Sequence, residues 1–134
     1  MKILILTEGG VGIAYGHITR CSALYDYFSS HGNECLIVVA NQGNVSETLV
    51  GMNFLEIQWY ATTPELVQLF RENDLVIIDS YLADLSLYKM ISSFNIRLFV
   101  IDDYCRLDFS NCTVINGAIG AENLPYKDKE IHLL

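Results

Sequence analysis

The sequence predicts an α/β domain in which a mostly parallel sheet lies between helices, a three-layer Rossmann-like arrangement. Short apolar runs alternate with segments in which apolar residues recur every three or four positions, as in buried strands followed by amphipathic helices. The first apolar run breaks into a glycine-rich turn just before a helix. A chain of 134 residues is long enough for one domain, 1–134, with a core of its own.

Strands are predicted where an apolar run is short and is bounded by polar or turn-forming residues. Seven ranges meet this condition: Lys2–Leu6, Cys35–Ala40, Phe54–Ile57, Leu75–Ile78, Leu98–Ile101, Thr113–Ile115 and Ile131–Leu134. Each run is much shorter than the roughly 20 apolar residues that cross a bilayer, so we expect no membrane insertion.

Helices are predicted where the apolar spacing is three or four. The range Gly16–Ser30 carries one apolar stripe and stops at Gly32. A later helix begins with Thr63 as its cap and Pro64 in its first helical position. Two further helices are predicted over Val45–Val50 and Leu85–Ser93.

Composition narrows the function classes. The net charge of -8 and the scarcity of Lys and Arg disfavour a nucleic-acid partner, because phosphate binding relies on clustered cations. The four cysteines lack the spacing of a zinc site and are interpreted as reduced core thiols, so no metal is predicted. The first residues lack the layout of a secretion signal, which favours a cytoplasmic location.

Polar side chains follow nearly all the predicted strands. In an open parallel sheet, the ligand crevice lies beyond the carboxyl ends of the strands. Residues there include Thr7, Glu8, Asn41, Gln42, Asp79, Ser80, Tyr81, Asp102, Asp103, Tyr104, Asn116 and Gly117. Asp102 and Asp103 are adjacent, so we expect one to anchor loops and the other to face the crevice. Any single one of these residues could instead cap a helix or start a turn.

The glycine-rich turn does not match the common nucleotide-binding loops. Gly10, Gly12 and Gly16 are spaced one residue too widely for the dinucleotide fingerprint, and Asn41 stands where that fingerprint needs an acid. Gly16 is followed by His17, not by the Lys-Ser/Thr pair of a P-loop. Glycines and a helix start still suit an anionic or polyhydroxylated small molecule.

His17 is the candidate catalytic residue. It lies in the first turn of a helix, where the positive end of the helix dipole disfavours imidazolium. A neutral imidazole can accept a proton from water or from a sugar hydroxyl. The alternative is a structural histidine that caps the loop or bonds a backbone carbonyl. His31 and His132 are given structural roles.

Four motifs resemble those of a known family. They are Ala14–Arg20 (AYGHITR), Val76–Tyr81 (VIIDSY), Val100–Asp103 (VIDD) and Val114–Asn116 (VIN). In this order, they resemble the amino-terminal half of the UDP-sugar hydrolases of pseudaminic acid biosynthesis and of the related spore coat polysaccharide biosynthesis proteins. The resemblance spans essentially the whole chain.

The resemblance implies a GT-B protein, built from two Rossmann domains, of which this chain supplies the sugar side. A nucleotide-binding carboxyl-terminal domain, not present in this chain, would hold UDP. His17 would act on the water that attacks the anomeric carbon, releasing UDP without a metal or other cofactor, and Tyr81 would face the sugar. The candidate substrate-binding residues are Gly12, Ala14, Tyr15, Gly16, Arg20, Asp79, Ser80, Tyr81, Asp103 and Asn116.

Two alternatives stay open. A glycosyltransferase of the same fold would use His17 on a sugar or lipid acceptor in place of water, and a binding domain would keep the fold without catalysis. The sequence is apolar up to Leu134, which predicts that the chain is the first half of a longer protein and inactive alone.

Overall fold

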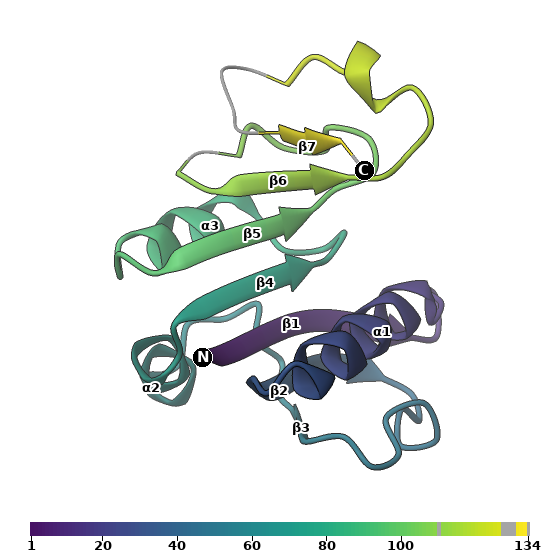
Figure 1. The fold of residues 1–134 in the computed structure, drawn as a ribbon, viewed down its shortest axis with the longest axis vertical. Helices are drawn as coiled ribbons and strands as arrows, with labels where there is room; N and C mark the ends of the chain where they lie inside the picture. Colours follow the sequence, from purple (N-terminus) through teal and green to yellow (C-terminus); the bar gives the residue numbers. More distant parts are fainter. Residues whose placement is uncertain (110, 127–130, 134) are drawn as a thin grey trace.

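The computed structural model describes residues 1–109, 111–126 and 131–133 and confirms the predicted Rossmann-like α/β architecture. Seven strands form one sheet in the order β3-β2-β1-β4-β5-β6-β7, and every neighbouring pair is parallel (Figure 1). The strands are β1 (Lys2–Gly10), β2 (Glu34–Gln42), β3 (Phe54–Glu56), β4 (Leu75–Asp79), β5 (Arg97–Ile101), β6 (Thr113–Asn116) and β7 (Ile131–Leu133). The helices are α1 (Gly16–Ser30), α2 (Pro64–Glu72), α3 (Leu85–Ser92) and the short 3₁₀ helix η1 (Ala121–Asn123).

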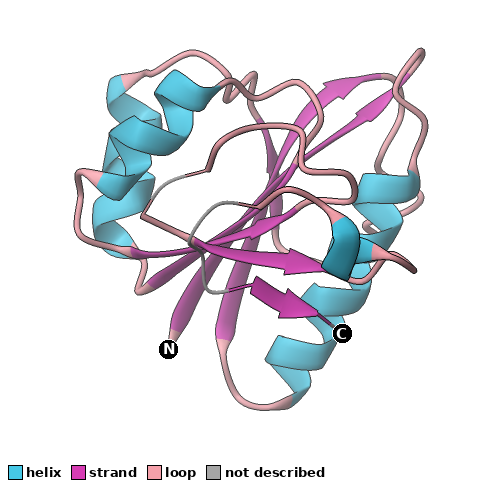
Figure 2. Ribbon diagram, turned by 90° about the horizontal axis from the view of Figure 1, so that it is seen from above, coloured by secondary structure: helices cyan, strands magenta, loops and turns pink. Residues whose placement is uncertain are grey.

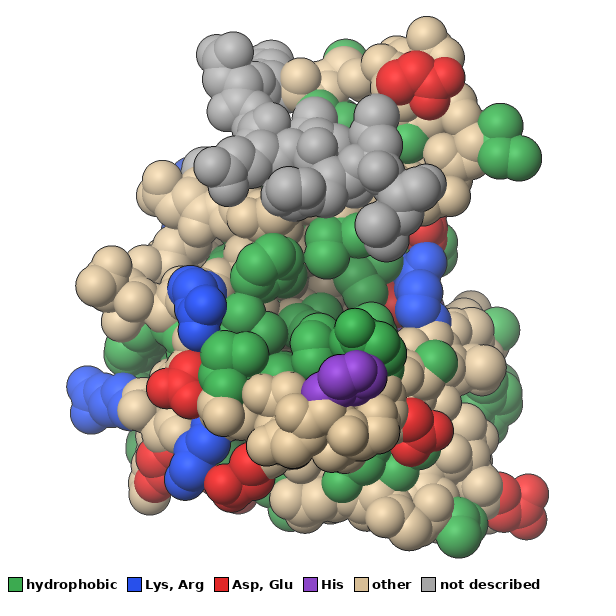
Figure 3. Space-filling model, viewed as in Figure 1, with side chains coloured by type: hydrophobic (Ala, Val, Ile, Leu, Met, Phe, Trp, Pro, Cys, Tyr) green, Lys and Arg blue, Asp and Glu red, His purple; other side chains and the backbone are tan. Residues whose placement is uncertain are grey.

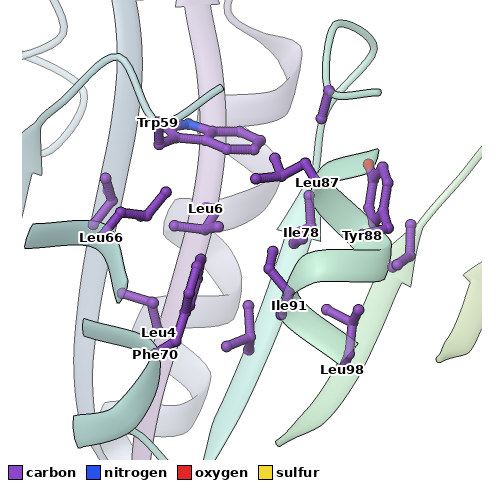
Figure 4. Packing of buried hydrophobic residues seen from close by; sticks show 14 of the residues in the cluster. Leu4, Leu6, Trp59, Leu66, Phe70, Ile78, Leu87, Tyr88, Ile91 and Leu98 are labelled. Carbon is purple, nitrogen blue, oxygen red and sulfur yellow. The ribbon is translucent and has the colours of Figure 1, made fainter. Parts of the chain in front are cut away.

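Helices lie on both sides of the sheet (Figure 2). α1 packs on one face, where Ile18 and Cys21 are fully buried against the inner strands. α2 and α3 pack on the opposite face, in a hydrophobic cluster that includes Trp59, Phe70 and Tyr88 (Figure 4). Burying a large apolar side chain stabilises the fold by roughly 1.5–3 kcal/mol, so these two clusters hold the layers together.

The order of the strands determines where a ligand can bind. The chain runs from β1 through β2 to β3 at one edge, and it then returns to place β4 on the other side of β1. The direction of winding therefore reverses between β1 and β4, which is the usual position of a ligand crevice in such sheets. The amino end of α1 lies beside this crevice because α1 directly follows β1.

Local signals account for the helix boundaries. Thr63 accepts a hydrogen bond from the Leu66 amide at 3.2 Å, and Pro64 is the first residue of α2, as predicted. Asp84 caps α3 in the same way, through the Leu87 amide at 3.1 Å. The predicted bounds of α1 are confirmed.

The largest differences from the predicted elements are in β1 and in the segment Val45–Val50. β1 continues past Leu6 to Gly10, because it pairs with β2 over its whole length. The predicted helix over Val45–Val50 is a turn, in which the amides of Thr48 and Leu49 both bond the Val45 carbonyl. Val45 and Leu49 are fully buried, so their helical spacing reflects one turn over the core and not a regular helix.

The predicted last strand is present as β7, with residue 134 outside the described residues. Within the described part of the chain, no helix has both the length and the apolar composition that crossing a membrane requires.

Candidate active site

The glycine-rich turn brings the chain from β1 into α1 within a few residues. The amides of Ile13 and Ala14 both donate to the Gly10 carbonyl, at 3.2 and 3.1 Å. Gly10 and Gly12 have φ values of 125° and 92°, which glycine adopts readily, and Ala14 has a φ of 67°. This tight turn places His17 in the first turn of α1.

His17 is held in one orientation by the end of β4. Its ring is 5% exposed, and Nδ1 lies 2.7 Å from Oδ1 of Asp79. A carboxylate only accepts hydrogen bonds, so Nδ1 carries a hydrogen, and in the neutral imidazole the lone pair is on Nε2. The described residues offer Nε2 no hydrogen-bond partner, and the ring lines a pocket. Nε2 is therefore the atom that can accept a proton from a ligand.

Arg20 joins the two carboxylates of the site. Its Nε and Nη2 donate to Asp79 at 2.7 and 2.8 Å, and its Nη1 and Nη2 donate to Asp103 at 2.9 and 3.2 Å. The hydrogen bonds to Asp79 raise the pKa of Arg20 above its ordinary value, and those to Asp103 add to this effect, although burial opposes both. The same contact with Arg20 lowers the pKa of Asp103. Four of the five guanidinium N–H groups are thus used inside the protein.

Tyr81 stands over the histidine. The two rings meet edge to face with centroids 4.3 Å apart, and the Tyr81 hydroxyl donates to Oδ2 of Asp103 at 2.7 Å. That hydrogen bond, together with burial, raises the pKa of Tyr81 to about 12. The phenol therefore stays protonated at neutral pH and acts as a wall and a hydrogen-bonding group, not as a base.

These side chains enclose a pocket of about 270 Å³ at the carboxyl ends of the strands. Its lining consists of Ile13, Ala14, Gly16, His17, Arg20, Tyr81 and Asp103. The structure thus brings together residues from three motifs that are far apart in the sequence. Asp79 lies directly behind the pocket, 1% exposed, where it contacts His17 and Arg20.

Other predicted site residues lie elsewhere. Ser80 is buried and donates to Glu8, and Asn116 bonds the Tyr126 hydroxyl at 2.8 Å and the Ala118 amide. Gly12 and Tyr15 belong to the turn but do not line the pocket. The Tyr15 hydroxyl packs over the backbone of Gly43, so closely that a side chain there would collide with it.

The predicted division between the two adjacent aspartates is confirmed. Asp102 is 2% exposed and accepts hydrogen bonds from the Cys105 and Arg106 amides and from the Tyr126 hydroxyl, so it anchors loops. Asp103 points the other way and lines the pocket with Arg20.

Glu8 is a residue whose role sequence reasoning missed. It is fully buried, and its carboxylate accepts hydrogen bonds from the Tyr60 and Ser80 hydroxyls and from the Tyr81 and Leu82 amides. This set of bonds fixes the turn after β4 that carries Tyr81. An acid placed directly after an apolar strand run was the available signal, but its partners lie more than 50 positions away.

Among the described residues, no cluster of His, Cys, Asp and Glu is arranged to hold a metal ion. A scan against protein-family models and a search of curated proteins find no match to this sequence.

Proposed function

We propose that this chain is the sugar-binding domain of a cytoplasmic nucleotide-sugar hydrolase of the GT-B type, acting in the synthesis of a bacterial surface polysaccharide or nonulosonic acid. In this proposal, UDP-sugar is the substrate and His17 is the general base. The observation that carries it is the orientation of His17: Asp79 holds Nδ1, and Nε2 is left as an acceptor at the pocket.

The chemistry follows from that orientation. Nε2 takes a proton from a water molecule while the water oxygen attacks the anomeric carbon of the sugar. The bond from this carbon to the phosphate oxygen breaks, and UDP leaves with the electron pair. A positioned base of this kind accelerates a reaction by about 10² to 10⁴. Asp79 is a positioning residue, because it contacts the imidazole and not the substrate.

The charges around the pocket favour an uncharged sugar ring there over a phosphate. Arg20 contributes one positive charge, whereas Asp79 and Asp103 contribute two negative charges. Four of the five N–H groups of Arg20 already donate to the two carboxylates, so only one remains for an anion. Asp103, Tyr81 and Nε2 instead present acceptors to hydroxyl or amide hydrogens. The proposal therefore places the diphosphate outside this pocket, on a second domain.

Isotope labelling tests the reaction. We expect the full-length gene product to release free sugar and UDP in equal amounts, without an added acceptor, from one member of a panel of UDP-N-acetylhexosamines. In H₂¹⁸O, the heavy oxygen should enter the sugar and not UDP, because water attacks carbon. A strict need for an acceptor alcohol would identify a glycosyltransferase, and label in UDP would contradict the role of His17.

Replacing His17 by Asn tests the base directly. The Asn amide can still donate to Asp79 from near the position of Nδ1, but nothing replaces Nε2. We expect kcat to fall by about 100-fold or more, with the thermal midpoint nearly unchanged. His31→Asn is the matched control, since His31 lies at the other end of α1 and should leave kcat as it is. Wild-type turnover in the His17 variant would remove the catalytic assignment.

A further inference from the structure

Two neighbouring hollows meet at Arg20 and Asp103, which line both. The larger hollow, of about 750 Å³ beside α1, is lined mainly by hydrophobic side chains (Figure 3). The smaller hollow is the active-site pocket, where His17 and Tyr81 join these two residues. A sugar ring needs hydrogen-bonding partners, so we expect the smaller pocket to recognise it.

The backbone of the glycine-rich turn has left-handed φ values at three positions. Two of them are glycines, Gly10 with a φ of 125° and Gly12 with a φ of 92°, and the third is Ala14 with a φ of 67°. Of these three residues, only Ala14 lines the pocket. The left-handed position that carries a side chain is therefore the one that faces the site.

The β-carbon of Ala14 contributes little to the packing of the described residues. Ala14 is exposed and belongs to neither hydrophobic cluster. In the left-handed conformation an alanine is less stable than a glycine, because its β-carbon lies too close to the backbone. Backbone strain of this kind gathers at functional sites. The position of the methyl group at the pocket thus points to a role in binding and not in folding.

Gly16 departs from the local backbone preference in the opposite direction. It also lines the pocket, and it is the first residue of α1, with a helical backbone. A β-carbon at this position would have no atom within 4 Å. Alanine would fit there without strain and would stabilise the protein, because glycine loses more backbone freedom on folding. The described residues therefore give no structural reason for a glycine.

We propose that Ala14 and Gly16 are specificity-determining residues of the sugar pocket. The methyl group of Ala14 contacts an apolar C–H surface of the bound sugar. The missing side chain at Gly16 lets the sugar ring approach the start of α1, beside His17, whose Nε2 accepts the proton. The inference deepens the proposed function and rests on it for the identity of the ligand.

Binding of the UDP-N-acetylhexosamine panel tests the inference separately from hydrolysis. Calorimetric titration of the full-length gene product gives the Kd of each member, and UDP alone is the control ligand. In Ala14→Gly, the Kd of the preferred member should rise about fourfold or more, because one methyl contact is lost. The ratio of its Kd to that of the next member should move toward one. In Gly16→Ala, the Kd should rise about tenfold or more, because the added methyl group takes up space that the ring needs.

Both substitutions should stabilise the protein while they weaken sugar binding. Ala14→Gly relieves strain, and Gly16→Ala restricts the unfolded chain, so each should raise the thermal midpoint by about 2 °C. Asp26→Ala is the matched control, since Asp26 is exposed on α1 and does not line the pocket. It should raise the midpoint through helix propensity and leave every Kd unchanged. UDP should bind all three variants as it binds the wild type.

The outcomes separate the inference from the proposed function. An unchanged Kd in either variant removes that residue from the sugar site, and an unchanged ratio in Ala14→Gly removes its role in specificity. Equal weakening of UDP and the UDP-sugar, or a lower thermal midpoint in both variants, also overturns the inference. A wild-type protein that binds a panel member without hydrolysing it contradicts the proposed function alone. Binding of no member contradicts both.

Discussion

Ala14 occupies a backbone conformation that favours glycine. Its φ of 67° lies in the left-handed region, where the β-carbon of an ordinary residue approaches the backbone too closely. Ala14 also lines the pocket, just before the start of the helix that carries His17. Backbone strain of this kind persists where surrounding contacts fix the conformation. Here the Gly10 carbonyl accepts a hydrogen bond from the Ala14 amide.

Ala14→Gly should therefore stabilise the protein. Relief of the left-handed strain, about 1–2 kcal/mol, exceeds the entropic cost of glycine, about 0.5–1 kcal/mol. We expect a net gain of about 0.5–1 kcal/mol in the free energy of unfolding, measured by urea denaturation. Ala23→Gly is the control, because Ala23 is exposed inside α1 and its replacement should destabilise by about 1 kcal/mol. Equal losses in the two variants would contradict the strain at Ala14.

Glu8 is the buried residue on which the turn after β4 depends. Glu8→Leu leaves the donors of Tyr60, Ser80 and Tyr81 without their acceptor, whereas the Leu82 amide keeps the Ser80 hydroxyl. Each unsatisfied buried donor costs about 1–3 kcal/mol, so we expect a loss of at least about 3 kcal/mol in the free energy of unfolding. Glu65→Leu, at an exposed position of α2, should change stability little. A loss below about 1 kcal/mol for Glu8→Leu would mean that the turn is held by other contacts.

At the scale of elements, Arg20 ties α1 to the ends of two strands. Asp79 ends β4, and Asp103 lies two residues beyond β5, so one guanidinium fixes the helix against both loops. The hydrophobic clusters align the layers, but they do not set where α1 begins relative to the crevice. The ion pairs with Asp79 fix the start of α1, and they place His17 at the carboxyl end of β4.

The link between α1 and Asp103 predicts a dependence of stability on pH. Arg20 lowers the pKa of Asp103 below its usual value of 3.8, so the pair stabilises the folded state above that pH. The contribution is lost as the pH falls through the folded-state pKa. Thermal melts between about pH 5 and pH 2 should therefore fall less steeply for Asp103→Asn than for the wild type. Parallel curves for the two proteins would show that Asp103 does not take part.

For the whole molecule, local patterns predict the architecture and miss the long-range partners. The bounds of α1 are predictable because Gly16 and Gly32 flank a clear apolar stripe. The separate roles of Asp102 and Asp103 follow from the alternation of side chains along a strand. The partners of Glu8 come from loops more than 50 positions away, and no local pattern specifies them.

The incomplete cover of β5, whose Phe99 and Ile101 are only half-buried on the α1 face, has a similar cause. The run Leu98–Ile101 is apolar throughout, which predicts a strand buried on both faces. Whether a layer covers each face depends on which side the later connections take, and the pattern of β5 does not contain this information. The prediction of a helix over Val45–Val50 is wrong for a related reason. Two buried residues four positions apart, Val45 and Leu49, are compatible with a single turn as well as with a helix.

The orientation of the His17 ring tests the central claim most directly. At about pH 8.5, well above the ordinary pKa of histidine side chains, long-range ¹H–¹⁵N spectra distinguish a protonated from an unprotonated ring nitrogen. We predict that Nδ1 carries the hydrogen, that Nε2 does not, and that adding the UDP-sugar identified as substrate by the isotope-labelling experiment shifts Nε2. A hydrogen on Nε2, or an Nε2 signal indifferent to that substrate, would contradict the account.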